Sequence, residues 1–153
     1  MDSKSIRFAF AVNQQNAFEP QNFGKADKFL IYEWVNSAFL FLNEEINHFK
    51  KLDEDQNGSV RKGTAIVDFL KGLDIKVLVS IKFGQNVQMV NRNFIPVIVF
   101  RETPDDVVLQ LRKHIKWIED ELRNRPDEFK LFTIKNGIMK TSLKKSSSLP
   151  SVN

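Results

Sequence analysis

A strict alternation of large and small side chains near the start of the chain constrains the fold more than any other feature. Across residues 5–12 one side holds Ile6, Phe8, Phe10 and Val12, and the other side holds Arg7, Ala9 and Ala11. A period of two is typical of a β-strand, because successive side chains of a strand point to opposite faces. The alanines on the second side indicate that this face is covered as well. The chain is therefore predicted to contain a sheet that is buried on both faces.

Two more strands are predicted directly after the first. Residues 28–34 and 38–43 are rich in apolar and aromatic residues, and the turn-like residues 35–37 separate them. The stretch 13–27 holds Asn, Gln, Pro and Gly, which favours a loop. Because the connections are short, we expect the three strands to form an antiparallel meander.

Beyond residue 63 the apolar period changes from two to that of a helix. Helices are predicted at residues 64–73, at 84–93 and from Pro104 to about Arg123, the last one capped by Thr103. Short apolar runs at 77–81 and 96–100 suit strands buried on both faces. The polar stretch 47–62 is interpreted as an exposed loop.

This order predicts an α/β fold. We expect a mixed five-stranded sheet, in which two parallel crossover strands follow the antiparallel meander and helices cover both faces. Residues 129–134 and 138–141 flank the turn signal Lys135-Asn136-Gly137 and predict a C-terminal β-hairpin. The chain is accordingly divided into a domain at 1–124, a hairpin extension at 125–142 and a disordered basic tail at 143–153.

The distribution of charge argues against a nucleic-acid partner. The chain has 23 Lys and Arg against 19 Asp and Glu, but the whole excess of four comes from the lysines of residues 135–153. Nucleic-acid binding needs clustered charge on a folded face, so a neutral domain with a basic tail is a poor match. No run is apolar enough to span a membrane, and residues 1–10 are too polar for a signal peptide, so we expect a cytoplasmic protein without a membrane partner.

The sequence offers no catalytic constellation. It contains no cysteine, and its only histidines, His48 and His114, have no acidic residue at metal-ligand spacing on a shared face. No nucleophile–base pair and no paired carboxylates can be named. We therefore expect a protein that is not an enzyme, with no catalytic residues and no metal-ligating residues.

Two glycine loops are the candidate binding residues. The first contains Asn22, Phe23, Gly24 and Lys25, and the second contains Lys82, Gly84, Gln85 and Asn86. A glycine lets backbone N–H groups approach an anion, and a lysine adds positive charge. The alternative interpretation is structural. The first loop would be a turn whose Phe23 packs into the core, and the second would only cap the helix that follows it.

The motifs around these loops resemble a known family. Phe23-Gly24-Lys25-Ala26 is followed by an aromatic strand, and later come Gly63-Thr64 at the head of a helix, the strand 77–81, Phe83-Gly84-Gln85 and the strand 95–99. Their order and spacing resemble the dinitrogenase iron–molybdenum cofactor biosynthesis family, which includes the NifX-type carriers and the end of NifB-type proteins. The resemblance covers roughly residues 5–122.

This resemblance implies both a fold and a ligand. The family has a ribonuclease-H-like fold, and its characterised members bind the iron–molybdenum cofactor or its precursor and pass it on without catalysis. The resemblance therefore implies a carrier for this cofactor or a related iron–sulfur cluster, with Gly63 and Thr64 joining the two loops as ligand-binding residues. The family commonly has histidine before Phe-Gly, whereas Asn22 stands here. Iron prefers thiolate or imidazole to an amide oxygen, so we expect no direct ligation from this loop.

The competing hypothesis is an interaction or regulatory module of the same fold that binds no cluster. The predicted hairpin at residues 129–141 supports it, because a hairpin offers a sheet edge for pairing with a protein partner or with a second copy of the chain.

Overall fold

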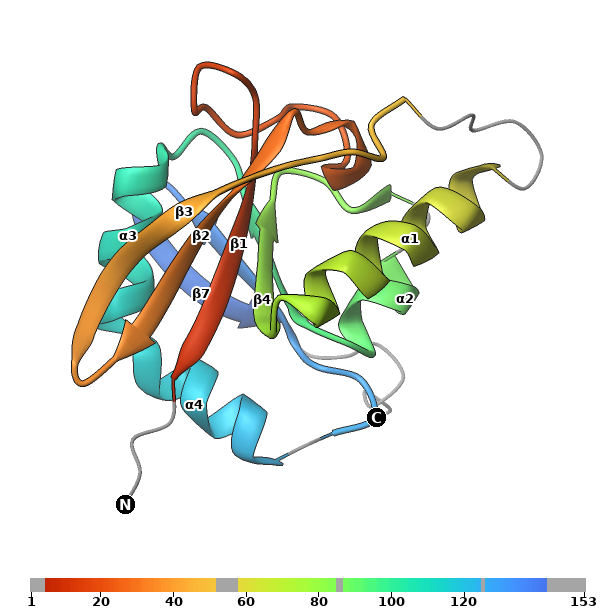
Figure 1. Cartoon of the computed structure of the whole chain (residues 1–153). Coiled ribbons are helices and arrows are strands. Elements are labelled where there is room, and N and C mark those ends of the chain that lie inside the picture. Colours follow the sequence, from red (N-terminus) through yellow and green to blue (C-terminus); the bar gives the residue numbers. More distant parts are fainter. Residues whose placement is uncertain (1–4, 52–57, 85–86, 125, 143–153) are drawn as a thin grey trace.

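The described residues form one seven-stranded mixed sheet with helices on both faces. The computed structural model (Figure 1) describes residues 5–51, 58–84, 87–124 and 126–142. The strand order is β3-β2-β1-β4-β5-β6-β7. The prediction of an α/β fold built on a mixed sheet is confirmed.

The antiparallel meander is present as predicted. Strands β1 (Ile6–Val12), β2 (Lys28–Val35) and β3 (Ala38–Ile46) pair antiparallel in sequence order. β3 extends three residues beyond the predicted end, because Glu44, Glu45 and Ile46 continue the pairing with β2. β3 forms one outer edge of the sheet.

The crossover strands are parallel, also as predicted. β4 (Ile75–Ser80) pairs with β1, and β5 (Ile95–Val99) pairs with β4. Helix α1 (Gly58–Gly72) precedes β4, and the short helix α2 (Val87–Asn91) lies between β4 and β5. Because β1 and β4 are parallel, their carboxyl ends lie at the same end of the sheet.

The sheet has seven strands where the sequence predicted five. β6 (Leu131–Lys135) adds parallel to β5, and β7 (Ile138–Ser142) pairs antiparallel with β6. The prediction treated this segment as an extension, but Phe132 and Ile134 are buried in the same core as β5. Burying these side chains against the edge of β5 makes β6 and β7 part of the main sheet.

The helix predicted from Pro104 to Arg123 is two helices. α3 (Pro104–Lys113) starts with the predicted Thr103 cap, which forms a reciprocal capping box with Asp106. His114 has non-helical angles, and α4 (Ile115–Asn124) begins after it. The residues at the break include no proline or glycine, so the local sequence does not predict it.

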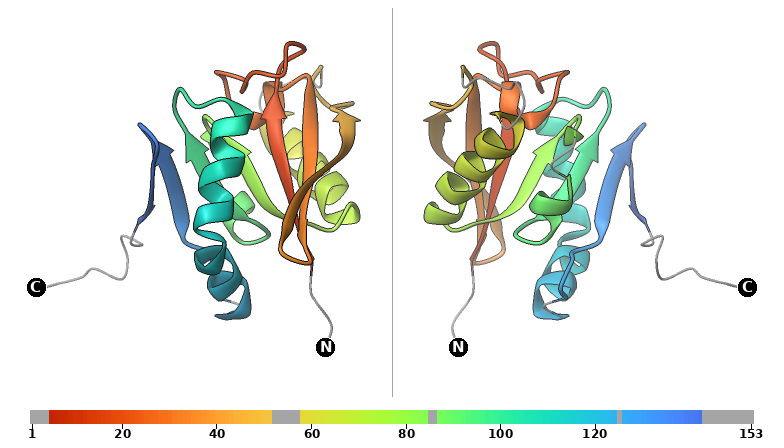
Figure 2. Two further views of the ribbon diagram at one scale, coloured as in Figure 1. Left: turned by 90° about the vertical axis from the view of Figure 1, so that its left-hand side faces the viewer. Right: turned by 90° about the vertical axis from the view of Figure 1, so that its right-hand side faces the viewer.

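Two apolar layers sandwich the sheet (Figure 2). One layer joins β1 side chains such as Phe8 and Phe10 to α3 and α4, and the other joins Ala9 and Ala11 to α1 and α2. The predicted coverage of both faces is therefore confirmed. None of the described helices is both long and apolar enough to cross a membrane.

Candidate functional site

The two candidate loops lie side by side at the carboxyl ends of β1 and β4. Asn22 and Lys82 form an isolated parallel bridge, and the Phe23 N–H donates to the Lys82 carbonyl at 3.1 Å. Beneath them the rings of Phe23 and Phe83 pack with centroids 5.8 Å apart. Residues 60 positions apart in the chain thus form one continuous surface. In open α/β sheets ligands bind beyond the carboxyl ends of the strands, which is where these loops lie.

Asn22 fixes the shape of the first loop. Its Oδ1 accepts a hydrogen bond from the Gly24 N–H at 3.0 Å and caps the short 3₁₀ turn Phe23–Lys25. A Cβ on Gly24 would lie 3.2 Å from Asn22 Oδ1 and 3.2 Å from Lys62 Cε, tighter than ordinary contact. The amide oxygen of Asn22 is therefore used to hold the turn.

Gly84 fits the second loop against the first. Its φ of +66° lies in the left-handed region that favours glycine, and a Cβ there would lie 3.4 Å from Asn22 Nδ2. Ser80 supports the same loop from below, since its buried hydroxyl donates to the Lys82 carbonyl at 2.9 Å. Gly84 thus lets the second loop approach Asn22 of the first, whereas Gly24 makes room for Lys62 of α1.

A comparison with protein families matches this part of the chain. Residues 4–114 match the family described as dinitrogenase iron–molybdenum cofactor. The chain belongs to this family. The match runs from β1 through α3 and includes both loops, so the predicted resemblance is confirmed. No curated protein matches the chain.

Asn47 is a member of this site that the sequence did not reveal. Its side chain is only 4% exposed, and its Nδ2 donates to the carbonyls of Gly24 at 3.1 Å and Ala26 at 2.9 Å. Its Oδ1 accepts from the Phe49 N–H at 3.0 Å. Every polar group of the amide is used, and the segment after β3 is fastened to the first loop.

Lys62 brings helix α1 to the same loop. The residue is 2% exposed, its stem lies against Gly24, and its Nζ donates to the Lys50 carbonyl at 2.9 Å. The prediction that residues 47–62 form an exposed loop is wrong at both ends, because Asn47 is buried and α1 already begins at Gly58. Polar composition misled that interpretation, since both buried residues satisfy their polar groups on backbone carbonyls.

The remaining predicted site residues are placed differently. Gly63 is buried within α1, next to Lys62. Thr64 is exposed and its hydroxyl lies 3.8 Å from Met89 Sδ, so it contacts α2. Gln85 and Asn86 lie outside the described residues.

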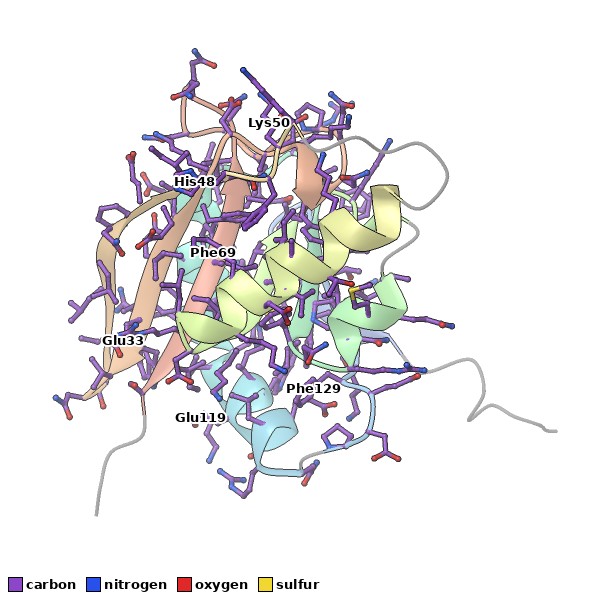
Figure 3. The ribbon with its side chains drawn as sticks, turned by 45° about the vertical axis from the view of Figure 1, so that its right-hand side comes forward. Glu33, His48, Lys50, Phe69, Glu119 and Phe129 are labelled. Atoms are coloured by element: carbon purple, nitrogen blue, oxygen red, sulfur yellow. The ribbon has the colours of Figure 1, made fainter. Side chains whose placement is uncertain are left out.

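Asp27, two residues after the first loop, is held by contacts with Lys50 and Gln14. Its carboxylate pairs with the Lys50 ammonium and accepts from the Gln14 N–H at 2.9 Å. The hydrogen bond from Lys50 is the largest influence on the pKa of Asp27 and holds it below its usual range, while burial opposes that shift. His48 and Lys50 lie at the loop end of the molecule, opposite to Glu119 and Phe129 (Figure 3).

Positively charged side chains gather around the two loops. Half-buried Lys25, buried Lys62 and exposed Lys82 border the two loops. The loops themselves contain no cysteine or histidine, and the described part of the chain holds no group of three His, Asp or Glu side chains that could bind a metal ion.

Proposed function

We propose that this chain is a carrier for an anionic metal–sulfur cluster, the iron–molybdenum cofactor or a related iron–sulfur species. The observation that supports the proposal most directly is the apposition of the Asn22–Lys25 and Lys82–Gly84 loops at the carboxyl ends of two parallel strands. Membership of the dinitrogenase iron–molybdenum cofactor family supplies the class of ligand.

The proposed cargo is held by charge and hydrogen bonding. Asn22 uses its oxygen to cap the turn, so it has no imidazole or thiolate to offer to iron. Lys82 is exposed and lies beside Gly84, where its ammonium can approach a bound anion. A cargo held in this way can be released without breaking a metal–protein bond, which suits a protein that hands its ligand on.

The proposal includes no catalytic step. We infer that the protein binds and transfers without changing its cargo, because no nucleophile–base pair accompanies the loops among the described residues. We also propose that strands β1 to β5, in the order β3-β2-β1-β4-β5, form a ribonuclease-H-like sheet.

Anaerobic titration of the full chain with isolated iron–molybdenum cofactor tests the carrier function. Protein repurified by gel filtration is expected to retain the absorption spectrum of the cluster in a one-to-one ratio. Loss of all cluster absorption from the protein at micromolar concentration would remove the proposal.

Two charge reversals locate the site. Lys82→Glu is expected to weaken retention by about tenfold or more, because it puts a carboxylate beside an anion. Lys140→Glu, an equivalent change of an exposed lysine on the distant strand β7, is expected to leave retention unchanged. Equal effects of the two variants would mean that only overall charge matters and that the loops are not the site.

A further inference from the structure

Strand β3 forms a long outer edge of the sheet. It pairs with β2 over Ala38–Ile46, and its other side faces away from the rest of the described sheet (Figure 2). An edge strand presents a row of backbone N–H and C=O groups that can pair with another strand.

The side chains of this edge are unusually apolar. Eight large apolar side chains are exposed in the described part of the chain, and four of them lie on β3: Leu40, Phe41, Leu42 and Ile46. The run from Ala38 to Leu42 contains no charge and no proline, the residues that usually protect an edge from pairing. A monomer would gain nothing from keeping these side chains in water.

We infer that β3 pairs antiparallel with β3 of a second copy of this chain, with Leu40 on the two-fold axis. In this register Ala38 lies opposite Leu42 of the second copy, and Phe39 lies opposite its Phe41. All five opposed positions are then apolar, which is the type of cross-strand pair that stabilises a sheet. The contact uses the same surface on both copies and closes as a dimer.

The acidic end of β3 fixes the antiparallel orientation. The β3 strand of the second copy starts at Ala38, so Glu44 and Glu45 would lie beyond the Asn36-Ser37 turn that joins its β2 to its β3. Glu44 and its equivalent are then eight residues apart along the paired strands, or about 26 Å, well beyond a Debye length of about 8 Å. A parallel pairing would place the two Glu44 side chains next to each other, and their repulsion disfavours it.

Charge also distinguishes β3 from the edge at the opposite side of the sheet. Lys140 is the central residue of β7, so a symmetric β7 pair centred on the strand would place two lysines in contact. The predicted pairing through the hairpin at residues 129–141 would use that edge. We therefore assign self-association to β3 and not to β7.

The expected dimer is weak. Leu40, Phe41 and Leu42 are 46%, 52% and 38% exposed, so together they would bury roughly 500 Å² over the two copies. Stable interfaces bury about 1,200 Å² or more, and backbone pairing makes up only part of the difference. A β-bulge at Leu42 interrupts the pairing with β2, which resumes at Asn43, and limits the length of the regular contact. Dissociation in the micromolar range or above is expected.

Sedimentation of the full chain over increasing concentration tests the association. The mass is expected to rise from 17.8 kDa toward twice that value and to stop there. Leu40→Lys, which places two lysines on the axis, is expected to keep a single-chain mass at every concentration. Ile138→Lys is the matched control on β7, since Ile138 is 56% exposed, and it should dimerise like the unmodified chain. A single-chain mass for the unmodified protein, or a mass that grows past two chains, would overturn the inference.

Engineered cysteines test the register, because the chain has no cysteine of its own. Residues directly opposite in an antiparallel pair have Cα atoms about 4.5–5.5 Å apart, within disulfide range. Leu40→Cys is therefore expected to form a covalent dimer under mild oxidation. Ile46→Cys on the same strand and Ile138→Cys on β7 are controls at more exposed positions that should not form this covalent dimer. Cross-linking of either at the same rate as Leu40→Cys would contradict this register.

Discussion

Removal of the Asn47 amide is the most direct test of how the first loop is held. The substitution Asn47→Ala takes the donor from the carbonyls of Gly24 and Ala26, and the acceptor from the Phe49 N–H. A buried polar group left without its partner costs about 1–3 kcal/mol. Three backbone groups lose their partner, but water can reach part of the half-buried segment that follows β3 and offsets some of this cost. We therefore expect the free energy of unfolding to fall by about 2–4 kcal/mol.

Urea unfolding followed by circular dichroism measures this loss, provided that the slope with denaturant is unchanged. Asn43→Ala is the control, because Asn43 lies nearby on β3, is exposed and bonds the Glu45 side chain, so its effect should stay within about 0.5 kcal/mol. Asn47→Asp keeps the shape but turns an oxygen toward two carbonyls, and should be as harmful as alanine at neutral pH. If Asn47→Ala unfolds at the same urea concentration as the control, the two amide bonds do not hold the loop.

Substitutions at Asp27, Gly84 and Glu121 test other contacts. The pKa of Asp27 is lower in the folded protein than in the unfolded chain. The stability that its charge contributes is therefore complete above about pH 5 and is lost as the pH falls through the folded-state pKa. Asp27→Asn should flatten the acid side of a curve of stability against pH, and an unchanged curve would refute this. Gly84→Ala should lower the free energy of unfolding by about 1–2 kcal/mol, because Gly84 has a positive φ. The control Gly72→Ala, where a Cβ at the end of α1 would meet open space, should be neutral or stabilising in thermal melts. Glu121→Ala should lower the free energy of unfolding by about 1–3 kcal/mol, because this buried carboxylate accepts a hydrogen bond from the Lys130 N–H at 2.8 Å. Glu121→Gln should recover most of that loss in the same melts, and equal losses would argue against the hydrogen bond.

The two glycine loops of the candidate site could be named from the sequence, but their arrangement could not. The glycines at positions 24 and 84 stand out as loop signals, and the family motif follows the same segments. Their contact depends on β1 and β4 being parallel neighbours, a long-range pairing that no local pattern encodes. Asn47 and Lys62 gave no signal at all, because a buried polar residue looks like any surface residue until its partners are known.

The sequence by itself determined the local elements. Alternation at β1 placed large side chains in one layer and alanines in the other, and the Thr103 cap set the start of α3. These features depend on neighbours within a few residues, where backbone geometry and capping leave little choice.

Only the tertiary structure decided how the sheet ends. β6 joins β5 because Phe132 and Ile134 complete a core formed by residues far away in the chain, which changes a five-stranded sheet into a seven-stranded one. The same extension moves one outer edge to β7 and leaves β3 as the other. Burial against distant residues is a property of the whole fold, so it lies beyond any pattern read along the chain.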